Sequence, residues 1–202
     1  MANRKKYAWI VGPDGCGKST ITSELTYYEN TIVKYWRPGL LPMPGKFPGF
    51  QYEVELNAQP HLRPTDRAFK STMRLMYYFA DYLLGDLFYI KLKKNSGVIL
   101  YERGWLDMFV DPKRYGLKKS KKVLALFKFL AKPKYIFVIT ADAKKIMQRK
   151  SELSTEEIER QYSEWNNMRF KKTRVIKIDN NEKMQSAVDT IVKILDYSSN
   201  QK

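Results

Sequence analysis

The chain is poor in the residues on which many enzyme sites depend, since its 202 residues include one cysteine, Cys16, and one histidine, His61. A single cysteine excludes an internal disulfide and is typical of a reducing, cytoplasmic setting. A single histidine disfavours a histidine-bearing zinc site and a His-based catalytic triad. No apolar run approaches the roughly 20 residues that a membrane span needs, and the polar segment 1–6 is not typical of a signal peptide.

Acidic residues are also scarce, because 21 Asp and Glu face 37 Lys and Arg, for a net charge of +16. Such an excess of positive charge favours anionic partners: nucleotides, nucleic acid, anionic glycans or an acidic membrane surface. A lysine-rich, solvated surface accounts for the same composition equally well. The charge therefore narrows the class of partner without selecting one.

The most specific pattern is a complete G-x-x-x-x-G-K-[ST] phosphate-binding loop, GPDGCGKST, over residues 12–20. An apolar segment typical of a buried strand precedes it, and a segment that can open a helix follows. Its glycines let backbone N–H groups turn toward phosphate oxygens, Lys18 can reach the β- and γ-phosphates, and the Ser19 hydroxyl can ligate Mg²⁺. The sequence therefore predicts a nucleoside triphosphate site, formed by Gly12, Gly15, Cys16, Gly17, Lys18, Ser19 and Thr20.

Segments typical of strands and helices alternate along the chain, which favours a parallel sheet with helices on both faces. The expected strands are 7–11, 31–36, 98–101, 135–139 and 174–178. Without an internal repeat or a long linker, residues 1–202 are expected to form a single α/β domain. The predicted fold class is that of a compact P-loop kinase, a five-stranded parallel sheet flanked by helices, with a short lid.

The longest expected helix covers about residues 66–93. Apolar residues recur along it every three or four positions and predict a stripe that faces the core; these are Phe69, Met73, Met76, Ala80, Leu83 and Leu87. A different stripe carries Arg74, Tyr78, Asp81 and Gly85. Tyr78 is the aromatic residue of this helix expected to face a ligand crevice. Three further helices are expected over residues 18–28, 120–130 and 182–197. Two more are expected to begin at residue 143 and at about residue 154, where the Ser154 side chain can cap the helix.

For phosphoryl transfer, an enzyme must bind the donor phosphates, position Mg²⁺, neutralise the negative charge that develops on the transferring phosphate and align the acceptor. Arg103 follows the third strand, where α/β sheets place ligands, and its guanidinium can fork onto phosphate oxygens. Glu102 can orient Arg103, hold Mg²⁺ through water or accept a proton; a purely structural Glu–Arg pair is the alternative. Arg37 follows the second strand and opens a Pro- and Gly-rich loop, about 37–50, on the acceptor side.

A short charged segment follows the fourth strand and its helix. Arg149 lies in this segment, and a mobile lid over about residues 148–155 would bring the arginine onto the triphosphate and expel water. An exposed helix end, where Lys and Arg suit the helix dipole, is the alternative. Cys16 is expected to fill space in the loop instead of acting as a nucleophile.

Several of these pieces together resemble the thymidylate kinase family. Segment 12–20 is similar to the family's phosphate loop, 37–39 (RPG) resembles its Arg-Glu-Pro-Gly turn without the Glu, and Glu102-Arg103 stands where the family has Asp-Arg. Segment 78–82 (YFADY) lies where its base-binding helix carries an aromatic residue followed by Asn-Arg, and Arg149 sits where its lid begins. The combination resembles a divergent branch of the family that is linked to surface-polysaccharide synthesis.

The resemblance implies ATP as donor together with Mg²⁺, for which the residues themselves offer Ser19 and Glu102 as ligands. It implies Lys18 and Arg103 on the transferring phosphate, with Asp14 near the acceptor. Arg37, Arg74, Tyr78 and Arg103 complete the expected acceptor site, and a homodimer through the long helix is expected by analogy. Tyr82 replaces an arginine that reads the thymine ring in the family, so the acceptor need not be dTMP.

Three functions remain open at this point. The first is a kinase with a non-standard acceptor, such as a sugar or glycan hydroxyl, for which Asp14 or Glu102 would serve as general base. The second is a nucleoside monophosphate kinase of the dTMP type, whose phosphate acceptor needs paired arginines and no base. The third is a nucleotide-dependent nucleic-acid-binding protein or 5′-end kinase, which the positive charge favours although no nucleic-acid recognition motif is present.

Overall fold

The computed structural model describes residues 6–28, 30–42, 67–92, 97–118, 126–127, 129–130, 132–150 and 153–195. Its contacts divide the chain into two compact units. The first takes its residues from Met1–Trp36, Lys94–Gly104 and Lys132–Lys202, and the second from Arg37–Lys93 and Trp105–Ala131. The expectation of one domain over the whole chain stays a prediction.

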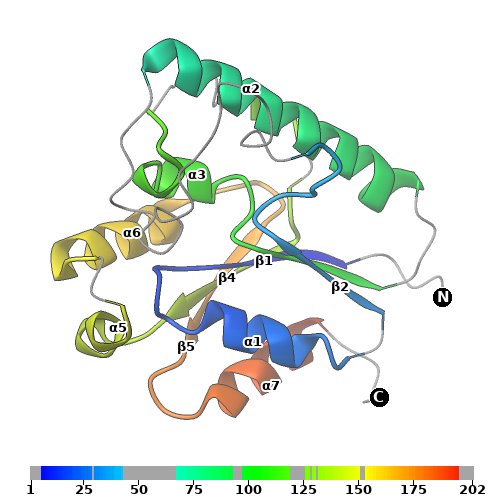
Figure 1. Cartoon of the computed structure of the whole chain (residues 1–202). Helices are drawn as coiled ribbons and strands as arrows, with labels where there is room; N and C mark the ends of the chain where they lie inside the picture. The colour runs from blue at the N-terminus through cyan, green and yellow to red at the C-terminus, as the bar shows by residue number, and fades with distance from the viewer. Residues whose placement is uncertain are drawn as a thin grey trace. The chain divides into compact units, whose positions relative to one another are not determined.

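The first unit contains a sheet of five parallel strands (Figure 1). The strands are β1 (Lys6–Val11), β2 (Thr31–Tyr35), β3 (Val98–Glu102), β4 (Tyr135–Thr140) and β5 (Arg174–Asp179). They confirm the five predicted strands to within one residue at each end. Continuous apolar runs such as YAWIV and YIFVI form these strands because a parallel sheet is buried on both faces.

The strand order is β2-β3-β1-β4-β5, so β1 lies between β3 and β4. The chain leaves β1 toward β2 and β3 on one side and then returns to β4 on the other. This reversal is the topological switch point, where open α/β sheets form a crevice beyond the carboxyl ends of their strands. The phosphate loop follows β1 directly and therefore starts at that point.

Four helices belong to the same unit: α1 (Lys18–Leu25), α5 (Ala143–Arg149), α6 (Thr155–Asn167) and α7 (Met184–Leu195). Helices α1 and α7 lie side by side, and α7 contacts β5 (Figure 1). One core joins the sheet to these helices through Ile10, Phe137, Ile21, Ile158 and Ile191, all with no exposed surface. As predicted, Ser154 caps α6, because its hydroxyl accepts a hydrogen bond from the Glu157 amide at 3.3 Å.

The second unit contains the longest helix, α2 (Ala68–Gly85), which continues as a π-helix, η4 (Asp86–Leu92). Two short elements follow, α3 (Asp107–Val110) and a 3-10 turn, η5 (Lys113–Tyr115). An aromatic cluster holds the unit together, with ring centroids 5.3–5.5 Å apart between Phe127 and each of Phe79, Trp105 and Phe109. Gly85 is required where it stands, because a Cβ there would lie 2.2 Å from the ring of Pro38.

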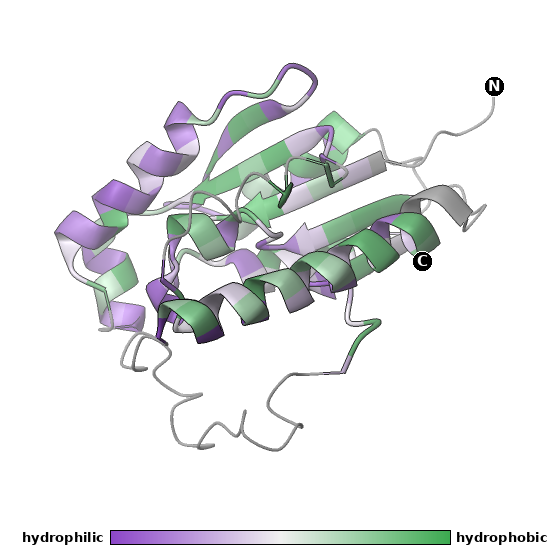
Figure 2. Cartoon of the chain, turned by 90° about the horizontal axis from the view of Figure 1, so that it is seen from above, coloured by the Kyte–Doolittle hydropathy of each residue, from purple (hydrophilic) through white to green (hydrophobic). Residues whose placement is uncertain are grey.

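The predicted core stripe of α2 is wrong. Most of its large side chains are exposed, from 77% for Phe69 to 46% for Leu87, and much of α2 is coloured hydrophobic in Figure 2. The buried face instead includes Arg74, Tyr78 and Asp81. Periodicity shows that a helix has two faces, but which face is covered depends on neighbours. The covered face combines Leu75 and Tyr82 with these polar residues, and polar partners in the same unit compensate its buried charges.

Some predicted elements fall wholly or partly outside the residues that the structure describes. Most of the expected helix over 120–130, most of the loop over 37–50 and residues 151–152 of the lid segment lie outside them. Within the parts of the chain that the structure describes, no helix is long and apolar enough to cross a membrane.

Candidate functional site

The phosphate loop ends in a helix N-terminus that carries no side-chain cap. Gly17 is the N-cap residue of α1, with a left-handed backbone (φ 99°), and no side chain accepts a hydrogen bond from the first turn. The first N–H groups of a helix have no partner inside the helix, and the helix dipole adds positive potential there. An uncapped N-terminus after a glycine-rich loop is therefore suited to bind phosphate.

Asn180, which follows β5, holds this loop from outside. Its side-chain amide donates a hydrogen bond to the Cys16 carbonyl at 2.9 Å. A Cβ on Gly17 would lie 2.3 Å from the same amide nitrogen, so a side chain there would disturb that contact. Cys16 itself is a fully buried free thiol, in agreement with its expected role as a space-filling residue. Thr20, by contrast, is exposed.

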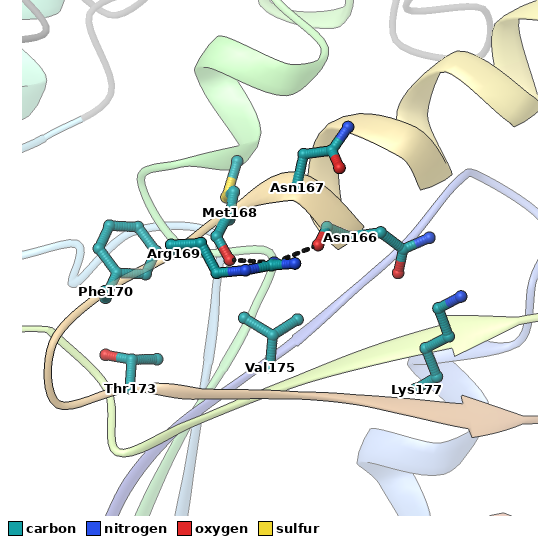
Figure 3. A pocket seen from close by; sticks show the side chains of 8 residues that line it. All are labelled: Asn166, Asn167, Met168, Arg169, Phe170, Thr173, Val175 and Lys177. Atoms are coloured by element: carbon teal, nitrogen blue, oxygen red, sulfur yellow. Dashed lines mark hydrogen bonds between the residues drawn. The ribbon is translucent and has the colours of Figure 1, made fainter.

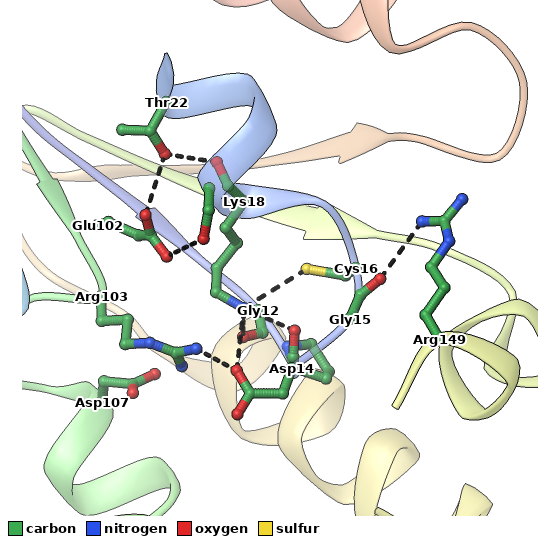
Figure 4. Close-up of polar contacts among 12 residues, drawn as sticks. Gly12, Asp14, Gly15, Cys16, Lys18, Thr22, Glu102, Arg103, Asp107 and Arg149 are labelled. Atoms are coloured by element: carbon green, nitrogen blue, oxygen red, sulfur yellow. Dashed lines mark hydrogen bonds and ion pairs between the residues drawn. The ribbon is translucent and has the colours of Figure 1, made fainter. Parts of the chain in front are cut away.

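Lys18 is the buried cation of the loop (Figure 4). Its ammonium donates hydrogen bonds to the Gly12 carbonyl at 2.7 Å and to the Pro13 carbonyl at 2.6 Å. The nearest carboxylate oxygen belongs to Asp14, at 3.8 Å. The loop therefore encircles a positive charge that is close to the uncapped N-terminus of α1, and both features attract the same phosphate chain.

Glu102 comes to the start of α1 through the pairing of β3 with β1. In this register Ile10 lies opposite Glu102, and the next residue, Arg103, donates its backbone N–H to the Ile10 carbonyl at 2.8 Å. The Glu102 carboxylate accepts a hydrogen bond from the Ser19 hydroxyl at 2.8 Å and a longer one from Thr22 at 3.4 Å (Figure 4). Two residues predicted to hold Mg²⁺ are thus in direct contact.

Arg103 and Asp14 form a buried ion pair at the same loop (Figure 4). Arg103 has a left-handed backbone (φ 82°), an uncommon conformation for a residue with a side chain. Such backbones cost about 1–3 kcal/mol and cluster at functional sites. The guanidinium also lies 6.0 Å from the centre of the Tyr35 ring. Asp14 thus contacts Arg103 and lies near Lys18, the two cations expected on the transferring phosphate.

Arg149 lies at the end of α5 and reaches the phosphate loop. It is exposed, and its guanidinium donates to the Gly15 carbonyl at 3.3 Å. Nearby, the backbone N–H of Ala141 donates to the Tyr162 hydroxyl at 3.0 Å. Burial raises the pKa of Tyr162, which therefore stays neutral at physiological pH. The first unit thus brings together Asp14, Lys18, Ser19, Glu102, Arg103 and Arg149.

The second unit contains the predicted acceptor residues Arg37, Arg74 and Tyr78. Arg37 is buried and forms an ion pair with Asp81 at 3.0 Å. The same carboxylate accepts the backbone N–H groups of Gly39 at 3.1 Å and Leu41 at 2.7 Å. Arg37 also donates to the Leu41 carbonyl at 2.9 Å. Asp81, with no exposed surface, therefore clamps the turn that starts at Arg37 onto α2.

Neighbouring contacts extend this cluster within the unit. Arg74 is buried and donates to the Tyr115 carbonyl at 3.3 Å, while the Tyr115 hydroxyl donates to Asp107 at 2.7 Å. The Tyr77 hydroxyl donates to the Pro42 carbonyl at 2.7 Å. Loss of water raises the pKa of Tyr77, an effect that Arg37 opposes and Asp81 reinforces. Tyr78 is buried beside this cluster on the covered face of α2.

Sequence reasoning missed three residues at these positions: Thr22, Asn180 and Asp81. Asp81 had a visible signal, because an aspartate inside an aromatic helix segment needs a partner if it is buried. Thr22 lies one turn after Lys18, but its contact with Glu102 depends on the sheet register. Asn180 had no signal, since its contact joins residues 164 positions apart.

No protein-family model and no curated protein sequence matches the chain. Solved structures match nearly all of it. A thymidylate kinase from Candida albicans gives a TM-score of 0.63 at 15% identity, covering 98% of this chain and 94% of the other. A thymidylate kinase from Ehrlichia chaffeensis gives 0.57 at 15% identity, covering 95% and 99%. A deoxyadenosine kinase from M. mycoides, with dCMP and dCDP bound, gives 0.57 at 15% identity, covering 94% and 98%.

These likenesses, together with the five-stranded parallel sheet and the loop after β1, establish the fold as that of the P-loop nucleotide kinases. The predicted fold class is confirmed, and the resemblance to thymidylate kinases holds at the level of fold. The finer expectation of a branch linked to surface polysaccharides stays a prediction.

The Arg37–Asp81 clamp leads to a stability prediction. Breaking a buried pair by changing one partner costs about 3–5 kcal/mol, because it leaves the other charge uncompensated. We expect Arg37→Gln and Asp81→Asn each to lower the free energy of unfolding by about that amount. The double variant should lose less than the sum of the two, with a coupling of about 0.5–3 kcal/mol.

Urea unfolding of the four proteins measures this cycle. Asp189→Asn, an exposed position on α7, is the matched control and should change stability by less than about 0.5 kcal/mol. Strictly additive effects of Arg37→Gln and Asp81→Asn would show that the pair does not couple.

Proposed function

We propose that this chain is an ATP-dependent phosphotransferase, a small-molecule kinase that moves the γ-phosphate of ATP to an acceptor. The observation that carries the proposal is the hydrogen bond of 2.8 Å between Ser19 and Glu102 at the uncapped start of α1, with Lys18 inside the loop. A phosphate cradle, an acidic group and cations then occupy one edge of one sheet. The kinase fold shared with the solved structures supports the proposal.

The residues present fit Mg²⁺. This ion prefers oxygen ligands and is commonly held by one or two carboxylates together with substrate phosphates. Among the described residues, no group of three or more His, Cys, Asp or Glu forms a cage that could hold a metal by itself. Ser19 and Glu102 supply a hydroxyl and a carboxylate, and phosphate oxygens would complete the shell. When bound, the ion would neutralise charge on the phosphates.

In this proposal the chain's own residues orient the donor and stabilise charge. The N–H groups of the loop and the Lys18 ammonium bind the phosphate chain, and Arg103 neutralises the negative charge that develops on the transferring group. Asp14 holds Arg103 in place through their ion pair. Arg149, already in contact with the loop backbone, would close over the triphosphate and exclude water.

A nucleoside monophosphate is the acceptor that the contacts favour. A hydroxyl acceptor benefits from a general base, and the expected bases were Asp14 and Glu102. In the structure Asp14 is paired with Arg103, and Glu102 accepts hydrogen bonds from Ser19 and Thr22. Both carboxylates therefore already have partners, whereas a phosphate acceptor needs no base. The solved structures that share the fold are named thymidylate and deoxyadenosine kinases, which supports a nucleotide or nucleoside substrate.

Among the described residues, no contact favours a sugar or glycan hydroxyl, or a nucleic acid, over a nucleoside monophosphate as the acceptor. The acceptor assay below distinguishes these alternatives. The cytoplasmic setting expected from the cysteine content also remains a prediction.

Turnover on a panel of acceptors tests the proposal. With ATP and Mg²⁺, the protein should phosphorylate one or more nucleoside monophosphates, and dTMP is the first to try. Lys18→Ala should lower turnover by about a hundredfold or more, because it removes a charge that stabilises the transferring phosphate. Transfer to sugars alone would overturn the acceptor assignment. Full activity of Lys18→Ala would show that the loop takes no part in catalysis.

Glu102→Gln tests the metal site separately. The substitution keeps the shape but removes the negative charge that attracts Mg²⁺, so half-maximal activity should need about tenfold more Mg²⁺. Glu159→Gln, an exposed position on α6, is the matched control and should leave the Mg²⁺ titration unchanged. An unchanged titration for Glu102→Gln would remove Glu102 from the metal site.

We also propose that the chain forms a homodimer through α2. The exposed apolar row on this helix supports it, because contiguous exposed apolar patches mark interaction sites. Sedimentation should show a dimer at micromolar concentration, and Met76→Glu should shift it toward monomer by placing a charge in the row. Phe129→Glu changes an aromatic residue that is 81% exposed elsewhere and should leave the dimer intact. A wild-type monomer at all concentrations would refute the dimer.

A further inference from the structure

The first unit contains a cavity that none of the phosphate-loop residues lines. This cavity of about 530 Å³ lies between the end of α6 and the strand β5, including the turn that joins them (Figure 3). An isolated antiparallel bridge between Phe170 and Thr173 shapes this turn. The Thr173 hydroxyl donates to the Pro133 carbonyl at 2.6 Å, which fixes the start of β5. Hydrogen bonds therefore hold the backbone of the turn that forms part of the cavity wall.

Two cations from different elements line the cavity. Arg169 comes from the segment after α6, and Lys177 comes from β5 (Figure 3). The Arg169 guanidinium donates to the Asn166 carbonyl and, at 2.9 Å, to the Met168 carbonyl, which holds the side chain against the helix end. Both cations are exposed. Neither has an ion-pair partner among the described residues, and no carboxylate lines the cavity.

The rest of the lining combines amide donors with an apolar wall. Asn166 supplies a side-chain amide at the end of α6, and the amide nitrogen of its neighbour Asn167 donates a hydrogen bond to the Ser163 hydroxyl at 3.2 Å. Phe170 and Val175, both half-buried, supply an aromatic ring and a branched aliphatic group. Pockets of 300–1,000 Å³ that bind small molecules have this composition, an apolar wall with a few polar groups that fix orientation.

The cavity is distinct from the phosphate site of the same unit. The phosphate loop follows β1, whereas β5 is the edge strand, separated from β1 by β4. At about 4.8 Å between neighbouring strands, β1 and β5 lie about 10 Å apart. Val175 belongs to the beginning of β5 and Thr173 precedes that strand, away from the carboxyl edge where the loop starts, whereas Lys177 lies further along β5, opposite Val138. None of the residues assigned to the phosphate site lines this cavity.

We propose that this cavity is a second binding site, for a small organic anion. The ligand is a phosphate or carboxylate carried on a planar or apolar body. Lys177 and Arg169 face the anionic group, the amide of Asn166 hydrogen-bonds to it, and the body packs on Phe170 and Val175. Two cations without a carboxylate favour an anion, and the adjacent apolar wall favours an organic anion over an inorganic one.

Fluorescence titration with 1-naphthyl phosphate tests the site on the full chain. Saturating Mg-ADP is present throughout, so that the phosphate loop is occupied. Binding should saturate at one equivalent, and the neutral analogue 1-naphthol should bind at least about tenfold more weakly. Lys177→Gln should weaken naphthyl phosphate by about tenfold, since hydrogen bonds to charged groups are worth about one decade of affinity or more.

The matched control is Lys172→Gln, an exposed position in the adjacent turn that does not line the cavity but changes the net charge equally. It should alter affinity by less than about twofold. The pair Arg169→Gln/Lys177→Gln against Lys171→Gln/Lys172→Gln repeats the comparison with two charges. Because Arg169 also contacts the end of α6, the single variant Lys177→Gln decides the test if the double variant does not fold.

Four results would overturn the proposal. They are binding that does not saturate, equal losses in Lys177→Gln and Lys172→Gln, equal affinity for naphthol, and complete displacement of the probe when Mg-ADP is added to a sample prepared without it, which would place the probe in the phosphate loop. Turnover with ATP should be the same for Lys177→Gln and the wild type, so the test is independent of the proposed kinase reaction.

Discussion

The position of β1 between β3 and β4 is the constraint on which the phosphate site depends. Pairing with β4 and β3 buries β1, so that the chain must leave the sheet sharply at Gly12. Pairing with β3 brings the end of that strand to the loop that follows β1, where Glu102 contacts Ser19 and Arg103 contacts Asp14. Without this pairing, Ser19 would have no carboxylate beside it and Asp14 would have no cation beyond the lysine of its own loop.

Buried charge in both units is held in mutually compensating groups. In the first unit, Asp14 lies between Arg103 and Lys18. In the second, Asp81 compensates Arg37 and two backbone N–H groups. Isolated buried charges are costly, whereas paired and hydrogen-bonded ones hold a defined geometry. A site that must bind a polyanion gains from such an arrangement, because its cations are positioned before the ligand arrives.

The same argument explains the helix on which sequence reasoning failed. The apolar residues of α2 predicted a core stripe, yet the structure covers the face that carries Arg74, Tyr78 and Asp81. That face also buries Leu75 and Tyr82, and its charges are compensated because Asp81 receives three donors and Arg74 has the Tyr115 carbonyl as an acceptor. The apolar row is left exposed to solvent, and only contact with another molecule would bury it. The exposure of this apolar row is the observation that supports the proposed dimer.

The sequence by itself determined the five strands, the phosphate loop and the cap of α6, because each depends on neighbouring residues: an apolar run, a glycine pattern, a serine three residues before a glutamate. It also placed Glu102 and Arg103 at a strand end. Only the tertiary structure decided that Glu102 contacts Ser19, that Asp81 clamps Arg37 and that Arg169 and Lys177 line one cavity. These pairings join residues from different elements, and strand register and helix orientation set them, which local sequence patterns do not encode.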